Sequence, residues 1–325
     1  MNLIQSLKGL SLEQQENLAV EIAGVKLKNP VMNASGTFGL DYKQYEPLDF
    51  LGAYVTKSMS LKPREGNAVP RICETPSGMV NSIGLENLGI DHFIVEELPV
   101  LYSMLGMKGT KIVVSIFGSS MDEYAEAAEK LNIDGVDMIE VNISCPNVKG
   151  NGMAFGVNPD VAHDVTAAVA RNTDKPVMPK LTPDAGALIG DVAEAVRTAG
   201  ANAISLVNTY PALPLEVNSK GEVVYSVANK NGGLSGPAIM PAALAMVDRV
   251  YKRVSISGIP IVGMGGISTW QDALCFMGAG ASAVAVGTAT FPNPYAIPEV
   301  IYGLAHYVKD HGAISECVGR IGTGR

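Results

Sequence analysis

Short runs of valine, isoleucine and other apolar residues recur along the chain, each followed by a turn and then by a helical stretch. These runs predict eight strands, over residues 31–34, 54–57, 112–116, 138–143, 177–180, 203–207, 260–264 and 283–286. Their apolar residues are continuous rather than alternating, which is typical of strands buried on both faces of a parallel sheet. Such repeated strand–helix units fold either into a closed (β/α)8 barrel or into an open, doubly wound sheet.

The segments between these runs have the residue pattern of amphipathic helices. The clearest covers 121–131 (MDEYAEAAEKL), with Ser119 or Ser120 as its expected N-cap. Similar helices are predicted at 160–170, 190–199, 238–254, 269–277 and 294–311. We predict the barrel, with the open sheet as the alternative, because there are eight strands. In addition, polar and glycine-rich residues follow the strand ends, where such barrels build their active sites.

The length of 325 residues would suggest two domains if each had about 150 residues. An α/β barrel is larger than an average domain, so we predict a single barrel domain covering residues 1–325. Two connecting segments, 58–89 and 206–234, are longer than ordinary loops. Segments of that length usually form lids or small inserted sheets, so the barrel is predicted to have enlarged βα loops.

The composition excludes several classes of protein. Hydrophobic residues make up 47% of the chain and charged residues 17%, which excludes intrinsic disorder. The net charge of -8, without a long Lys/Arg cluster, argues against nucleic-acid binding. We expect no membrane span and no signal peptide, because the chain has no apolar run of about 18 residues and a polar start. The four cysteines are far apart, which predicts no disulfide framework or metal site and favours a reducing cytoplasm; they are Cys73, Cys145, Cys275 and Cys317.

Glycine is enriched, with 35 residues in 325 or about 11%, against a usual share of about 7%. Part of the excess lies in GMGGIS (263–268), after the seventh predicted strand, and in AVGTAT (285–290), after the eighth. Loops seven and eight form the recurrent phosphate site of (β/α)8 barrels, where small residues let backbone N–H groups approach a phosphate. The alternative is that both segments are only tight turns. The absence of G-x-G-x-x-G after an early strand disfavours a Rossmann fold.

Two lysines and one cysteine stand at predicted strand ends. Lys57 ends the second strand and Lys180 the fifth, so both are expected to point into the barrel mouth. A lysine at a buried strand end needs an anionic partner. The pair therefore fits a cofactor that becomes negative on reduction together with an acidic substrate, or else structural ion pairs. Cys145 lies just past the fourth strand in a loop rich in Gly, Pro and Asn, where it could act as an acid or base.

Four amides, Asn81, Asn142, Asn147 and Asn208, occur at separate predicted strand–helix junctions. Amides present a donor and an acceptor side by side, which suits a ring with amide-like edges. A single such residue is more often part of a turn, but four at one end of a barrel favour a binding site.

Over nearly its whole length the sequence resembles the class 1 dihydroorotate dehydrogenases, FMN-dependent barrels of pyrimidine biosynthesis. The motifs that carry the resemblance are NPVMNASGTFG, GAYVTKS, KPREGN, NSIGLEN, VNISCPNVKGNGMAFG, NGGLSGPAI, GMGGIST and AVGTATF. The resemblance implies oxidation of dihydroorotate to orotate, with Cys145 removing the proton from carbon 5 and hydride passing from carbon 6 to flavin nitrogen 5. Lys57 would be catalytic as well, in contact with both flavin and substrate.

The resemblance also implies two sets of binding residues. The orotate site would comprise Lys57, Asn81, Ser82, Ile83, Gly84, Leu85, Asn142, Asn147, Asn208 and Thr209. FMN would contact Ala34, Ser35, Lys57, Ser58, Ser115, Asn142, Lys180, Val207 and Gly236, with its phosphate on Gly265, Gly266, Gly287 and Thr288.

The motif sequences are most similar to those of the NAD-linked class. In that class a second subunit carries FAD and a 2Fe–2S cluster, and the chain forms a homodimer. The fumarate-linked class also uses the cysteine and is the alternative for the electron acceptor. The quinone-linked class, which carries serine there, is disfavoured by Cys145. Two departures from the NAD-linked pattern are Ser115, where asparagine is usual, and the segment 210–217.

Two other functions remain open from the residues. A uracil- or thymine-reducing barrel like the catalytic part of dihydropyrimidine dehydrogenase typically reads S-C-P-H, whereas Asn147 here favours orotate. A non-enzymatic barrel is disfavoured by the presence of Lys57, Cys145 and Lys180, although a fold alone never fixes a function.

Overall fold

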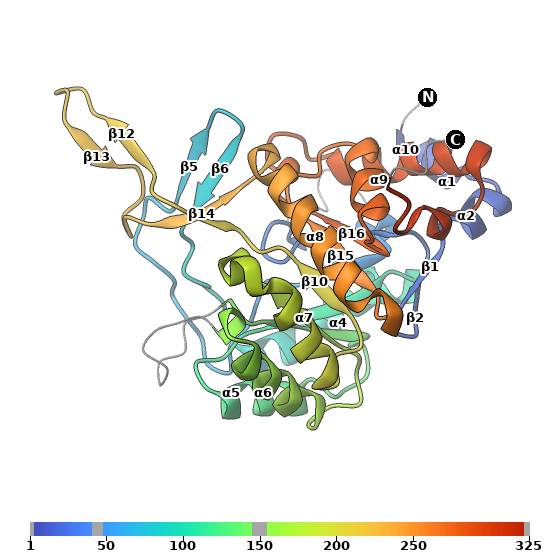
Figure 1. Ribbon diagram of the computed structural model, residues 1–325, viewed down its shortest axis with the longest axis horizontal. Helices are drawn as coiled ribbons and strands as arrows, with labels where there is room; N and C mark the ends of the chain where they lie inside the picture. Colours follow the sequence, from blue (N-terminus) through green and yellow to red (C-terminus); the bar gives the residue numbers. More distant parts are fainter. Residues whose placement is uncertain (1–2, 41–47, 145–154, 322–325) are drawn as a thin grey trace.

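Eight parallel strands close into a barrel in a computed structural model that describes residues 3–40, 48–144 and 155–321 (Figure 1). The strands are β3 (Val31–Asn33), β4 (Ala53–Val55), β7 (Lys111–Ile116), β8 (Met138–Asn142), β9 (Val177–Leu181), β10 (Ile204–Leu206), β15 (Ile261–Met264) and β16 (Ala283–Val286). They follow the ring in chain order, and the pairing of β16 with β3 closes it. This closure confirms the barrel and excludes the open sheet, and each strand coincides with a predicted run to within a few residues.

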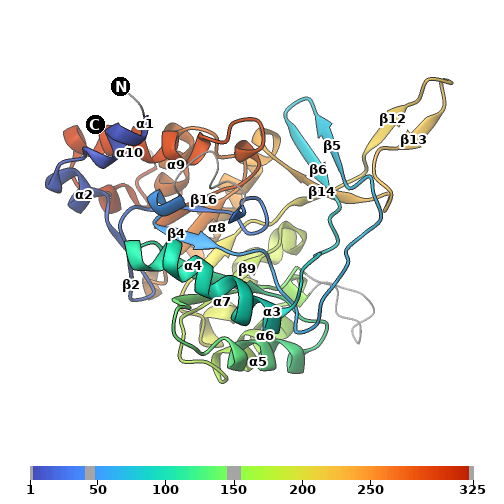
Figure 2. The same ribbon diagram turned by 180° about the vertical axis from the view of Figure 1, so that it is seen from behind.

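The predicted helices are present around the barrel, with starts that differ by at most two residues (Figures 1 and 2). They are α5 (Met121–Lys130), α6 (Pro159–Ala170), α7 (Ile189–Thr198), α8 (Met240–Val254), α9 (Trp270–Gly278) and α10 (Ala296–His311). Ser120, rather than Ser119, is the N-cap of α5, because its side chain accepts a hydrogen bond from the backbone N–H of Glu123. Such a cap satisfies one of the free N–H groups at a helix start.

Several elements were not predicted. The described chain begins with α1 (Leu3–Lys8), α2 (Leu12–Leu18) and a hairpin of β1 (Val20–Ile22) and β2 (Val25–Leu27). A helical stretch before β7 consists of α3 (Ile90–His92), a π-helical turn η3 (Phe93–Glu97) and α4 (Leu98–Met104). Short 3-10 turns are η2 (Leu48–Phe50), η4 (Gly106–Lys108), η5 (Phe155–Val157), η6 (Pro183–Leu188), η7 (Pro237–Ile239), η8 (Ser255–Ser257), η9 (Thr288–Thr290) and η10 (Ile314–Cys317).

The interior of the barrel is apolar at one end. Ile22 and Leu27 of the β1–β2 hairpin pack in one buried cluster with strand residues such as Met178 and Val262. In both views this hairpin lies at the end of the barrel away from the inserted strands (Figures 1 and 2). The opposite end, where the strands finish, is therefore the one open to a ligand.

The two long segments form inserted sheets, as predicted, and they pair with each other. β5 (Ile72–Thr75) and β6 (Gly78–Asn81) follow β4, whereas β11 (Tyr210–Ala212) and β14 (Gly232–Ser235) follow β10. Together they make a four-stranded antiparallel sheet in the order β11-β14-β6-β5. A further hairpin of β12 (Leu215–Val217) and β13 (Val223–Tyr225) projects from the body of the molecule (Figure 1). None of the helices in the described part of the chain combines the length and apolar character needed to cross a bilayer.

Candidate active site

A cavity of about 580 Å³ lies where the barrel strands end, between the strand ends and the inserted sheet. This volume is within the range of roughly 300–1,000 Å³ that is usual for small-molecule sites. Most of the predicted site residues line it: Ala34, Ser35, Lys57, Ser58, Asn81, Ser82, Ile83, Gly84, Leu85, Asn142, Lys180, Val207, Asn208, Thr209, Gly236, Gly265, Gly266, Gly287 and Thr288. The fold thus brings residues from seven strand ends and from β6 to one place.

Sequence reasoning missed part of the lining. The additional residues are Gly36, Thr37, Ile72, Met79, Glu86, Ser144, Gly233, Ser235, Ile239, Met264, Ala285 and Phe291. Several of them belong to β5, β6 and β14, whose pairing across distant parts of the chain carries no local sequence signal. Gly36, Thr37 and Ser144, by contrast, directly follow predicted site residues or strand ends, and this position could have identified them.

One end of the cavity is walled by the backbone of the loops after β15 and β16. A Cβ atom added at Gly266 would lie 2.8 Å from the carbonyl oxygen of Gly236 and 2.8 Å from the Cβ of Met240. Gly266 also has a φ of +82°, which favours glycine. The backbone here is packed too closely for a side chain. Such bare backbone N–H groups, close to the start of α8, can receive an anion such as a phosphate.

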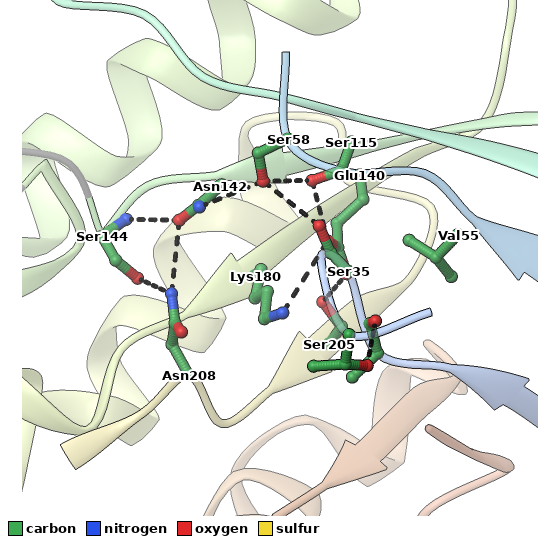
Figure 3. Close-up of polar contacts among 12 residues, drawn as sticks. Ser35, Val55, Ser58, Ser115, Glu140, Asn142, Ser144, Lys180, Ser205 and Asn208 are labelled. Carbon is green, nitrogen blue, oxygen red and sulfur yellow. Dashed lines mark hydrogen bonds and ion pairs between the residues drawn. The ribbon is translucent and has the colours of Figure 1, made fainter. Parts of the chain in front are cut away.

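A chain of polar side chains forms another wall (Figure 3). The Ser58 hydroxyl lies 3.3 Å from the Ser35 hydroxyl and accepts a hydrogen bond of 3.3 Å from the Asn142 amide. The Asn208 amide in turn donates to the Ser144 hydroxyl at 2.8 Å. Asn142 is anchored further by its backbone carbonyl oxygen, which accepts a hydrogen bond of 2.6 Å from the buried Tyr124 hydroxyl. These contacts hold the amides in defined orientations before any ligand arrives.

The two lysines differ in their surroundings. Lys57 is exposed on the cavity wall, and no described acidic group forms an ion pair with it. Lys180 is 5% exposed, and its Nζ lies 3.9 Å from Oε1 of the buried Glu140. The prediction that both point into the barrel mouth therefore agrees with the structure. A structural ion pair, the alternative considered from the sequence, applies to Lys180 in addition to its place in the cavity.

Ser115, which is predicted among the flavin contacts, is not one of the residues that line the cavity. It is fully buried, and its hydroxyl lies 2.8 Å from the hydroxyl of Ser58, which does line the cavity. The reason is its position in β7: Ser115 is one layer deeper in the barrel than the strand ends. Its hydroxyl is connected to the cavity lining through Ser58.

The KPREGN motif, to which the sequence assigned no role, supports the rim of the cavity. The Asn67 amide donates to the carbonyl oxygen of Ser82 at 3.0 Å, and Arg64 Nε donates to the carbonyl oxygen of Gly84 at 3.0 Å. A Cβ at Gly84 would lie 2.6 Å from Asn67, so the two segments are in direct contact. This scaffold fixes the backbone of residues 82–85, which face the cavity.

Two predicted residues, Cys145 and Asn147, lie outside the described residues. Ser144, the residue before Cys145, is described and lines the cavity. The other cysteines are elsewhere: Cys73 lies in β5, Cys275 in α9 and Cys317 in η10, and none of them lines the cavity.

Comparison with known proteins identifies the family. A family model described as dihydroorotate dehydrogenase matches residues 17–308. A protein of Thermoanaerobacter sp. (strain X514) is 49% identical over 309 residues, covering 94% of this chain and 99% of the relative. A protein of Geotalea uraniireducens is 45% identical over 312 residues, covering 94% and 99%. One of Geobacter sulfurreducens is 44% identical over 313 residues, covering 95% and 99%.

All three relatives are named dihydroorotate dehydrogenase B (NAD(+)), catalytic subunit. The family match extends across the barrel strands and their loops, including every described residue that lines the cavity. The resemblance inferred from the motifs is therefore confirmed. The chain belongs to the dihydroorotate dehydrogenase family of flavin-dependent oxidoreductases.

Proposed function

We propose that this protein oxidises dihydroorotate to orotate with FMN, as the catalytic subunit of an NAD-linked enzyme in pyrimidine biosynthesis. The observation that carries the proposal is that one cavity joins a glycine-walled end, two lysines and a set of oriented amides. The names of the relatives support the acceptor. The alternative acceptor is fumarate, and the test below separates the two.

The residues present fit FMN. Gly265, Gly266 and Gly287 offer bare backbone for its phosphate, because a Cβ at Gly266 would meet other backbone at 2.8 Å. Ala34, Ser35, Ser58 and Lys180 would hold its ring system. Bound FMN would supply the hydride acceptor. Lys180 would favour negative charge on the reduced ring, since its ammonium lines the cavity.

The chain's own residues would bind the substrate and move one proton. Cys145 would take the proton from carbon 5, and its neighbour Ser144 is tied to the cavity wall by Asn208 at 2.8 Å. Asn81, Asn142 and Asn208 would pair with the amide-like edges of the pyrimidine ring. Lys57, which has no described ion-pair partner, would neutralise the substrate carboxylate.

The proposal extends to partners and location. A separate electron-transfer subunit, with FAD and a 2Fe–2S cluster, would carry electrons from FMN to NAD. The words "catalytic subunit" in the relatives' names support such a partner.

We also propose a homodimer of single-domain chains. The exposed Val217 and Val223 on the β12–β13 hairpin, each 68% exposed, support an association surface. The cytoplasm is the proposed location, consistent with the unpaired Cys73, Cys275 and Cys317.

A pull-down from the native host tests the acceptor. The tagged chain should copurify with a subunit that contains FAD and iron–sulfur, and the complex should reduce NAD⁺ with dihydroorotate. Recovery of the chain alone, with dihydroorotate oxidised by fumarate but not by NAD⁺, would favour the fumarate-linked alternative. Ligand binding tests the substrate: orotate should bind more tightly than uracil, and the reverse order would favour a uracil- or thymine-reducing enzyme.

Replacing Lys57 by alanine should weaken orotate binding by about 10- to 100-fold, the effect of losing a hydrogen bond to a charged group. Lys180→Ala should weaken it less, because that lysine is assigned to the flavin. Titration of both FMN-loaded variants with orotate checks the order. Equal losses of affinity would contradict the two assignments.

Asn67→Ala should weaken orotate binding about three- to tenfold and leave FMN binding unchanged, because Asn67 fixes the backbone of Ser82 at the rim. Asn132→Ala is the matched control, because Asn132 makes a similar contact at the surface. Its side-chain carbonyl oxygen accepts a hydrogen bond from the backbone N–H of Asp174. An equal change of orotate affinity in both variants would show that Asn67 has no specific role at the rim.

A further inference from the structure

Glu140 is a buried carboxylate that the proposed mechanism does not use. It lies in β8 and is 1% exposed. Its inward-facing neighbour two residues earlier, Met138, belongs to the apolar cluster inside the barrel. Glu140 therefore sits on an apolar floor, directly below the layer of residues that lines the cavity. A carboxylate in such a place is costly unless it is paired, so its partners indicate what it does.

The partners of Glu140 are two hydroxyls and one ammonium. Oε1 accepts a hydrogen bond of 3.0 Å from the Ser115 hydroxyl, and Oε2 accepts one of 3.1 Å from the Ser205 hydroxyl. The ammonium of Lys180 lies 3.9 Å from Oε1. These residues come from β7, β9 and β10, and they form one polar layer across the barrel (Figure 3).

Two of these contacts lead to the cavity and one does not. Lys180 lines the cavity itself, and Ser115 reaches it through its 2.8 Å contact with Ser58. Ser205 is fully buried and does not line it. The distance of 3.9 Å from Lys180 to Glu140 exceeds a hydrogen bond, so the carboxylate opposes the ammonium's charge without engaging its N–H groups directly.

We infer that Glu140 is a positioning residue for the flavin site: it holds Ser115, and through it Ser58, from below, and it offsets the positive charge that Lys180 presents to the ring. The inference rests on the proposed function, because it assigns the cavity to FMN. Its consequence is electrostatic. In an interior of low dielectric, a carboxylate next to the ammonium lowers the stabilisation of negative charge on the reduced flavin.

The Glu140→Gln variant tests the charge. It keeps the size of the side chain and removes its negative charge, so the Lys180 ammonium is left uncompensated. The midpoint potential of bound FMN, measured by reduction in the presence of a reference dye, should shift to a higher value than in the unaltered protein. An unchanged or lower potential would overturn the inference.

A matched pair of variants tests the fixing of Ser58 and does not depend on the folding of Glu140→Gln. Ser115→Ala and Ser205→Ala each remove one hydroxyl from the same carboxylate, at 3.0 and 3.1 Å. Only Ser115 connects onward to the cavity. Ser115→Ala should weaken FMN binding by about threefold to tenfold, the usual effect of one lost hydrogen bond, whereas Ser205→Ala should leave it unchanged. Equal changes of FMN affinity in the two variants would show that Glu140 has only a structural role.

These measurements distinguish failure of the inference from failure of the proposed function. If the unaltered protein binds no FMN, the function itself is wrong. The unaltered protein could instead bind FMN that dihydroorotate reduces, while Glu140→Gln leaves the midpoint potential of FMN unchanged and the two serine variants bind FMN equally well. In that case only the role of Glu140 is wrong.

Discussion

Replacing Cys145 by serine is expected to slow the reduction of bound FMN by dihydroorotate by about 10²- to 10⁴-fold at neutral pH. This is the range that a general base usually contributes, and a serine hydroxyl is a far poorer base than a cysteine thiol. Binding of FMN and orotate should persist, because serine differs from cysteine by a single atom of the side chain. Anaerobic stopped-flow spectroscopy of the flavin absorbance measures the rate.

Cys275→Ser is the control for the cysteine substitution, since Cys275 lies in α9 and does not line the cavity. Its flavin should be reduced at the rate of the unaltered protein. A Cys145→Ser variant that is reduced equally fast would contradict the role of Cys145 as the base.

The second large effect is expected at the glycine-walled end of the cavity. Gly266→Ala should weaken FMN binding at least tenfold, because the added Cβ would lie 2.8 Å from the Gly236 carbonyl oxygen. A residue with a side chain at this positive φ also costs about 1–3 kcal/mol. The backbone must move to relieve both, and the N–H groups that would receive the phosphate move with it. FMN fluorescence on titration of the flavin-free protein gives the affinity.

Gly278→Ala is the matched control for this substitution. A Cβ at Gly278, at the end of α9, would have no atom within 4 Å. FMN should bind to this variant as it does to the unaltered protein. If Gly266→Ala also binds FMN normally, the phosphate does not lie against the loops after β15 and β16.

The strands could be predicted because strands buried on both faces leave a local signature. Each of the eight runs is a block of mostly apolar residues, and each forms a strand of the barrel. The β1–β2 hairpin was missed because its three-residue strands are too short to show a period. The stretch from α3 to α4 was missed because it directly follows the long segment read as a loop.

The site was predictable where its residues lie at strand ends and less so where it depends on pairing at a distance. The pairing of β6 with β14, at Val80 and Leu234, joins two long loops and has no local signal. The resemblance predicts Ser115 as a flavin contact, and the structure shows its hydroxyl 2.8 Å from that of Ser58, which lines the cavity. Glu140 is visible in the sequence as a charged residue inside the apolar run MIEVN, but only the barrel register reveals its partners.

The proposed function requires that the cavity hold FMN and that dihydroorotate reduce it. The most direct measurement is an anaerobic titration of the purified, yellow protein with dihydroorotate, followed by flavin absorbance. The oxidised flavin band should disappear, and one orotate should form for each FMN reduced. A protein that releases no FMN on denaturation, or whose bound FMN stays oxidised with dihydroorotate in excess, would contradict the proposed function.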